Sequence, residues 1–225
     1  MLVRILKLLN EDQLKAVEDV IASGQFEDGA ITTGAPTKAV KNNEQLALAS
    51  HPGHQEILRG INELFLKHPL IRSTALPLRI TPPLISRYRE GQAYGWHIDN
   101  PIMTGIGGPV RSDLACTIFL SDSSTYDGGE LHLRTQSGDA RVKLERGDAV
   151  IYPATFQHEV TAVTRGERLA LVLWIQSMIA DPGKREVLHE LNMAYNHVMK
   201  ENPGSEALQL IQRTQSNLIR RWAEN

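Results

Sequence analysis

A histidine and an aspartate separated by one residue, His97 and Asp99, are the residues best placed for chemistry in this chain. On an extended chain, side chains two positions apart point to the same side, so both could hold one metal ion. Two histidines and one carboxylate form the facial triad that binds Fe(II) and leaves positions open for other ligands. The tripeptide alone is weak evidence, because a solvated pair or a structural histidine is the commoner meaning of so short a motif.

A triad of this kind needs a second histidine from a distant strand. The histidines downstream of Asp99 are His132, His158, His189 and His197. His189 and His197 fall in helical patterns and are expected at the surface. His132 alternates with two leucines and is expected on the outer face of a strand. His158 opens a predicted strand just after a turn, where a ligand at the mouth of a β-barrel belongs, so we predict it as the second histidine.

Arg168, ten residues after His158, could recognise a carboxylate. Its guanidinium stays charged at any working pH and fits a carboxylate in two contacts. We expect residues 165–167 to form a hairpin loop, so that Arg168 pairs with Thr164 and points inward like His158. A buried guanidinium then needs an anion. The alternative is an outward Arg168 paired with Glu167 or Glu159.

The composition describes an ordinary globular protein with one main core. The chain has 225 residues, 41% hydrophobic and 22% charged, and a formal net charge of -2. No dense basic run occurs, so we expect neither nucleic acid nor a membrane as a partner. The single cysteine, Cys116, cannot form an internal disulfide, which favours a reducing compartment. The first residues are too charged for a signal peptide and no stretch could span a bilayer, so we expect a cytoplasmic protein.

The elements that position these residues are expected to form a β core flanked by helices. Apolar spacing predicts a short strand at 2–9 and helices at 11–23 and 53–67. Residues 28–45 lack apolar periodicity and are expected to be a polar loop, either a substrate lid or a surface connection. Short apolar segments separated by glycine-containing turns predict an all-β barrel or jelly roll. These segments are 114–120, 129–133, 142–144, 149–152, 160–163 and 169–175.

The last part of the chain is predicted to be helical, from Asp181 to 201 and again after a break at 202–204. We therefore expect three units: N-terminal supporting elements (1–76), the β core with the site (77–178) and a C-terminal helical extension (179–225) packed on that core. The extension could also mediate a homodimer. The apolar residues for such a contact are Leu208, Ile211, Leu218 and Trp222.

The combined pattern of His97, Asp99, His158 and Arg168 resembles that of Fe(II)- and 2-oxoglutarate-dependent dioxygenases. The closer match is to the prolyl/lysyl-hydroxylase-like branch, and in particular to the bacterial PKHD-type hydroxylases associated with iron uptake. The resemblance extends over nearly the whole chain and implies a double-stranded β-helix (jelly roll) with flanking helices. It rests on the motifs at residues 40–45, 87–88, 94–99, 111–114, 119–121, 126–131, 152–153 and 174–178.

The resemblance implies a role for each matched position. His97, Asp99 and His158 correspond to the iron ligands, and Arg168 corresponds to the arginine that binds the far carboxylate of 2-oxoglutarate. Tyr88 stands where related hydroxylases have a tyrosine whose hydroxyl also reaches this cosubstrate. The implied activity is hydroxylation with O₂, in which 2-oxoglutarate becomes succinate and CO₂ and L-ascorbate keeps the iron reduced.

The substrate is left open by the sequence: a peptide, a free amino acid or a siderophore-like small molecule. Departures from the family pattern at 100–112 and 152–156 border the site and affect substrate choice. Candidates for substrate contacts are Asn42, Asn43, Arg111 and Asp113. Two other functions compete. A cupin-like metalloenzyme would not use 2-oxoglutarate, which Arg168 argues against. A sensor would bind iron and 2-oxoglutarate without turnover, which the intact triad argues against.

Overall fold

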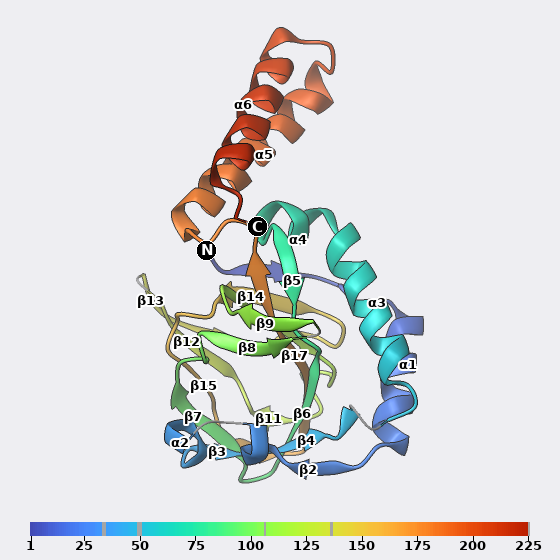
Figure 1. Ribbon diagram of the computed structural model, residues 1–225. Coiled ribbons are helices and arrows are strands. Elements are labelled where there is room, and N and C mark those ends of the chain that lie inside the picture. Colours follow the sequence, from blue (N-terminus) through green and yellow to red (C-terminus); the bar gives the residue numbers. More distant parts are fainter. Residues whose placement is uncertain (33–34, 49–50, 106, 136, 225) are drawn as a thin grey trace.

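Two antiparallel β-sheets form the centre of the computed structural model (Figure 1), which describes every residue except 33–34, 49–50, 106, 136 and 225. The larger sheet has the order β1 (Val3–Ile5), β14 (Ala149–Pro153), β10 (Leu114–Phe119), β17 (Glu167–Ser177), β6 (Leu84–Arg89), β4 (Glu44–Leu46) and β2 (Phe26–Asp28). β5 (Pro77–Ile80) also pairs with β17. The smaller sheet has the order β13 (Gly138–Val142), β12 (Leu131–Thr135), β15 (His158–Val160), β7 (Ala93–His97) and β3 (Lys41–Asn42).

Side chains from both sheets meet in one apolar layer. Ala115 and Phe119 of the larger sheet pack in the same buried cluster as Leu131 and Leu133 of the smaller sheet. Two short ladders complete the β structure: β8 (Ile102–Gly105) with β9 (Gly108–Arg111), and β11 (Asp127–Gly128) with β16 (Val163–Arg165). This arrangement confirms the predicted fold class, a mainly β jelly roll with flanking helices.

Helices cover the outer face of the larger sheet (Figure 1): α1 (Glu11–Ser23), α3 (His54–Lys67) and α4 (Pro69–Thr74). α1 begins at a capping box, in which Asn10 and Gln13 each accept a hydrogen bond from the other's backbone N–H. Leu14 of α1 and Phe65 of α3 are buried in one cluster with Ile118 and Leu171 of the sheet. The helices predicted at 11–23 and 53–67 are confirmed, whereas α4 was not predicted.

The expectation of a loop over 28–45 is wrong for most of its described residues. They form a 3₁₀ helix at Gly29–Thr32, α2 (Ala35–Lys38), β3 and β4. β4 pairs with β2 and β6, and β3 pairs with β7. Strands of two or three residues are too short to show an alternation of apolar and polar residues in the sequence. They form here because neighbouring strands provide their hydrogen-bond partners. Residues 33 and 34 lie outside the described part.

The C-terminal helices α5 (Pro182–Glu201) and α6 (Glu206–Trp222) form a hairpin that extends away from the β core (Figure 1). Leu188 near its base lies in a buried cluster with Leu76 and Ile179, against which Trp222 packs. The division into three units and the homodimer contact stay predictions. Within the described residues, no helix combines the length and apolar character needed to cross a membrane.

The adjacent residues Phe65 and Leu66 give a test of this packing, because Phe65 is 1% exposed and Leu66 is 64% exposed. We expect Phe65→Ala to lower the free energy of unfolding by about 3–5 kcal/mol, since it leaves a cavity between α3 and the sheet. We expect Leu66→Ala to change it by less than about 0.5 kcal/mol. Urea unfolding of both variants measures the difference, and equal losses would contradict the packing described.

Candidate metal centre

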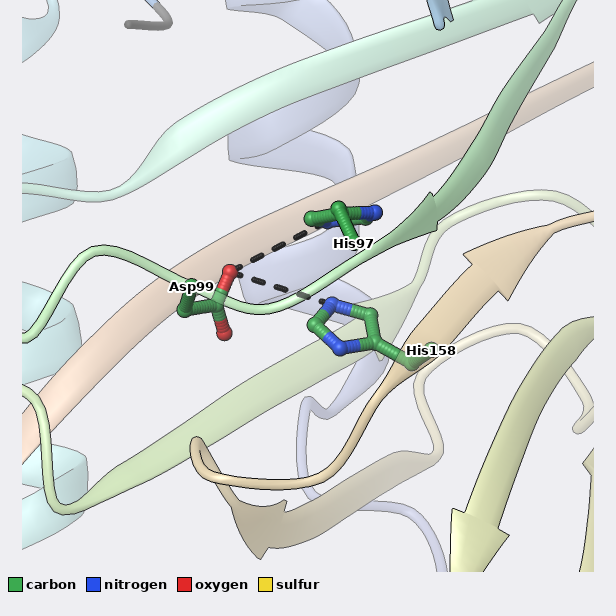
Figure 2. Close-up of side chains that lie close together, drawn as sticks. All are labelled: His97, Asp99 and His158. Atoms are coloured by element: carbon green, nitrogen blue, oxygen red, sulfur yellow. Dashed lines mark ion pairs between the residues drawn. The ribbon is translucent and has the colours of Figure 1, made fainter. Parts of the chain in front are cut away.

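His97, Asp99 and His158 come together at the centre of the smaller sheet. His97 ends β7, Asp99 follows two residues later, and His158 begins β15 directly opposite His97 in the antiparallel register. Figure 2 shows the Asp99 carboxylate facing both imidazole rings, whose centroids lie 4.2 Å apart. Residues about sixty positions apart in the chain therefore meet because β7 and β15 are hydrogen-bonded neighbours.

The distances between these side chains suit three ligands of one ion. Asp99 Oδ1 lies 4.0 Å from His97 Nε2 and 3.8 Å from His158 Nε2 (Figure 2). One ligand atom from each residue lies within 4.8 Å of the other two. These separations are too long for hydrogen bonds. Ligand atoms at right angles around an ion and each about 2.1 Å from it are about 3.0 Å apart, so these separations would shorten by about 1 Å when the three side chains bind one ion.

Backbone carbonyls orient both imidazoles in the same way. His97 Nδ1 is 2.8 Å from the carbonyl oxygen of Gly95, and His158 Nδ1 is 2.9 Å from that of Phe156. A carbonyl oxygen only accepts hydrogen bonds, so Nδ1 must carry the proton. Each Nε2 therefore directs a free lone pair toward Asp99, as metal-binding histidines do.

The side chains of the triad are buried, and burial changes the pKa of both Asp99 and His97. Oδ2 of Asp99 is buried and meets no donor at hydrogen-bond geometry within the described residues, although the indole N–H of Trp174 lies close enough to act against the rise in the carboxyl pKa. Burial raises the pKa of the Asp99 carboxyl. Burial, with a further contribution from His158, lowers the pKa of His97 to about 3. A neutral His97 and a desolvated carboxylate are the forms that bind a metal cation, so the donor set fits one.

Arg168 lies inside the fold beside this centre. It is 2% exposed, its Nε is buried without a partner, and it makes no ion pair within the described residues. Burial raises the pKa of the neutral Tyr126 hydroxyl, and the guanidinium lies close enough to act against that rise, but this hydroxyl brings no negative charge. Tyr88, opposite it on β6, places its ring centroid 5.2 Å from the guanidinium carbon. Burial raises the pKa of Tyr88 to about 12, so its hydroxyl stays a donor. The two side chains together offer donors to an anion.

The alternative of an outward Arg168 is wrong. Glu167 pairs instead with Arg89, and Glu159 contacts His132.

The hairpin that was expected to turn Arg168 inward is also wrong. β17 pairs with β10 and β6, where Arg168 faces Tyr88, while β16, which contains Thr164, pairs with β11. His158 and Arg168 face the same interior because they lie on two sheets that face each other, and shared parity along one hairpin plays no part.

Two adjoining cavities meet at the triad. The inner one, of about 60 Å³, is lined by Arg168, Tyr88 and all three triad residues. The outer one, of about 440 Å³, is lined by His97 and Asp99 but not by Arg168. Two residues that sequence reasoning missed, Lys41 and Tyr94, line both. Tyr94 stacks on His97 with ring centroids 3.6 Å apart. Its place three residues before His97 was the only local signal.

The other candidate residues lie elsewhere. His132 places its two ring nitrogens 3.1 Å from Glu159 and 3.2 Å from Asp139. His189 and His197 are on α5. The proposed substrate-contact residues, Asn42, Asn43, Arg111 and Asp113, line neither cavity. Arg111 and Asp113 bind each other, and Arg111 also binds Glu224.

Comparison with known proteins decides the family. The family model described as the 2OG-Fe(II) oxygenase superfamily matches residues 83–176. A PKHD-type hydroxylase of Hyphomonas neptunium is 42% identical over 218 residues, which cover 96% of this chain and 97% of that protein. The chain belongs to the PKHD-type hydroxylase family. It is an Fe(II)- and 2-oxoglutarate-dependent dioxygenase.

Solved structures share the fold of this PKHD-type hydroxylase. A Pseudomonas putida prolyl-4-hydroxylase aligns with a TM-score of 0.58 and 18% identity, over 78% of this chain and 92% of that chain. A Trichoplax adhaerens prolyl hydroxylase, solved with a hypoxia-inducible-factor peptide fragment, aligns with a TM-score of 0.57 and 17% identity, over 83% and 86%. At these identities the likeness establishes the jelly-roll fold.

The effect of the buried Arg168 charge on the free energy of unfolding can be measured by comparison with a second buried arginine, Arg185. Arg185 is also buried, but its Nη1 donates to the carbonyls of Ile179 and Ala180, both at 2.7 Å. In protein without added ligands, we expect Arg168→Met to leave the free energy of unfolding unchanged or to raise it by about 1–4 kcal/mol. We expect Arg185→Met to lower it by about 1–3 kcal/mol, because two carbonyls lose their donor. Chemical unfolding measures both, and an equal loss in the two variants would show that Arg168 is satisfied within the fold.

Proposed function

We propose that His97, Asp99 and His158 hold the iron of this hydroxylase. The observation that carries the proposal is that two buried Nε2 atoms, each set by an Nδ1–carbonyl hydrogen bond, face one carboxylate with an unpartnered oxygen. Iron held there supplies the oxidative chemistry that couples conversion of 2-oxoglutarate to substrate hydroxylation. The protein's part is to hold the three ligands on one side and to exclude bulk water from the inner cavity.

Arg168 and Tyr88 bind the far carboxylate of 2-oxoglutarate in this proposal. Unlike Arg185, the buried Arg168 guanidinium has, within the described residues, no carbonyl acceptor or carboxylate of the protein beside it, so a bound anion stabilises it, and the inner cavity connects it directly to the triad. The protonated Tyr88 hydroxyl adds a neutral donor next to the guanidinium. Together they orient the cosubstrate so that its other end reaches the metal ligands.

The outer cavity receives the substrate. It is the larger of the two cavities, and it reaches His97 and Asp99 from the side away from Arg168. The substrate is an amino acid, free or peptidyl, or a siderophore-like small molecule; the bound peptide in the Trichoplax adhaerens structure supports the peptidyl form. Ascorbate keeps the iron reduced, and the activity serves iron uptake or homeostasis in the cytoplasm.

Anaerobic titration with Fe(II) tests the three ligands. We expect His158→Ala and Asp99→Ala each to weaken iron binding more than about 100-fold, because a ligand is lost outright and even supporting residues are worth about 10–100-fold. His132→Ala is the matched control, since His132 lies outside both cavities. Equal weakening by His132→Ala, or normal binding by His158→Ala, would refute the assignment.

Calorimetric titration of 2-oxoglutarate into the anaerobic Fe(II) protein tests the proposed roles of Arg168 and Tyr88. We expect Arg168→Met to weaken binding about 10–100-fold, because a charge-assisted contact is lost, and Tyr88→Phe to weaken it less. Succinate formation with Fe(II), ascorbate and O₂ should follow the same order. Binding without any succinate would favour the sensor, and turnover indifferent to 2-oxoglutarate would favour the cupin-like enzyme.

A further inference from the structure

Asp99 differs from the two histidines of the triad in how its backbone is held. His97 ends β7 and His158 begins β15, and these two residues pair with each other in the smaller sheet. Asp99 lies in the segment 98–101, which follows β7 and belongs to no strand. Its side chain is nevertheless buried, with 7% exposure. The position of this carboxylate therefore depends on what fixes a segment that has no strand partner.

Ser112, between β9 and β10, fixes the segment that carries Asp99. Its Oγ donates a hydrogen bond to the carbonyl oxygen of Asn100, and its backbone N–H donates to that of Pro101 at 3.0 Å. Within the described residues, these are the hydrogen bonds that the backbone of 98–101 makes. Pro101 has no N–H to donate, so the segment can be held there only through its carbonyl groups. Ser112 is itself buried, with 8% exposure.

Asp113 connects Ser112 to the larger sheet. Its backbone N–H donates to the carbonyl oxygen of Ile175 at 3.1 Å, and its Oδ2 accepts a hydrogen bond from the Ser177 N–H at 2.8 Å. Ile175 and Ser177 belong to β17, the middle strand of that sheet. Arg111 grips the same carboxylate, with Nε 2.8 Å from Oδ1 and Nη2 3.1 Å from Oδ2. A carboxylate held in two contacts by a guanidinium has a well-defined orientation.

The buried part of this network is the part that can position a ligand. The Asp113 side chain is 8% exposed. Arg111 also binds Glu224 at 2.7 Å, but the Glu224 side chain is 54% exposed, so water screens that ion pair. Arg111, Ser112 and Asp113 line neither cavity. Their influence on the site must therefore pass through the backbone that they hold, and not through contact with a ligand.

We propose that Ser112 is a positioning residue for the iron ligand Asp99, and that Arg111 and Asp113 anchor Ser112 to β17. The inference rests on the proposed function, because it takes Asp99 as an iron ligand. A carboxylate oxygen binds a transition metal at about 2.0–2.2 Å, so a displacement of its backbone weakens the bond. In this arrangement the smaller sheet positions the two histidines, and the larger sheet positions the aspartate through Ser112.

Anaerobic titration with Fe(II) tests the role of Ser112. Ser112→Ala removes the hydrogen bond to Asn100 and keeps the one from the backbone N–H to Pro101. We expect it to weaken Fe(II) binding about three- to tenfold, the effect of one hydrogen bond of ordinary strength. The visible absorption of Co(II) bound in place of iron reports the geometry of its ligands. We expect its bands to shift in Ser112→Ala.

Asp113→Asn tests the anchor. We expect it to weaken Fe(II) binding at least as much as Ser112→Ala, because the charge-assisted contacts with Arg111 are lost. If this variant does not fold, Ser112→Ala alone decides the question.

Two control variants separate positioning from general loss of stability. Asn10→Ala removes the N-terminal cap of α1, which lies on the outer face of the larger sheet, and urea unfolding verifies that it destabilises the protein. Glu224→Gln removes the exposed ion pair with Arg111. We expect both controls to bind Fe(II) like the wild type and to leave the Co(II) absorption unchanged.

Three results would overturn the inference: wild-type Fe(II) affinity in Ser112→Ala, equal weakening in Asn10→Ala, or a wild-type Co(II) spectrum in Ser112→Ala. Titration of Asp99→Ala separates this inference from the proposed function. If Asp99→Ala binds Fe(II) like the wild type, the proposed function fails. If Asp99→Ala loses iron and Ser112→Ala does not, only this inference fails.

Discussion

The antiparallel pairing of β7 with β15 is the constraint on which the site depends. It places His158 directly opposite His97, and the chain after β7 brings the Asp99 carboxylate to face both rings. The carbonyls of Gly95 and Phe156 then set the direction of both imidazoles. If β15 were shifted by one residue relative to β7, the side chain of His158 would point to the other face of the sheet and the triad would not form.

The site stores unfavourable electrostatics that the rest of the fold must outweigh. A carboxylate, a guanidinium and an ammonium are buried or partly buried near one another, and within the described residues the Arg168 side chain has no anion. The compensation comes from the opposite side of the larger sheet, where α1 and α3 bury their apolar faces. Such a division is typical of enzymes, in which a binding site is destabilising until its ligands arrive.

The two sheets contribute separate parts of the site. The smaller sheet provides the triad, while β6 and β17 of the larger sheet provide Tyr88 and Arg168. The triad and the two donor side chains therefore face each other across the space between the sheets. Segments added around this core, β3 and the β8–β9 ladder, line the outer cavity with Lys41, Ile102 and Met103.

The sequence by itself determined what local spacing can encode. It placed His97 and Asp99 on one side of an extended segment and gave α1 and α3 their buried faces. It also put Arg168, Val172 and Trp174 on one face of β17, and these three side chains line the inner cavity. The sequence also singled out His158, but only the tertiary structure set it directly opposite His97. The tertiary structure alone decided why Arg168 points inward and that Lys41 and Tyr94 border the triad. The physical reason is that such contacts depend on strand register and on which sheets face each other, and residues far apart in the chain carry no periodic signal of either.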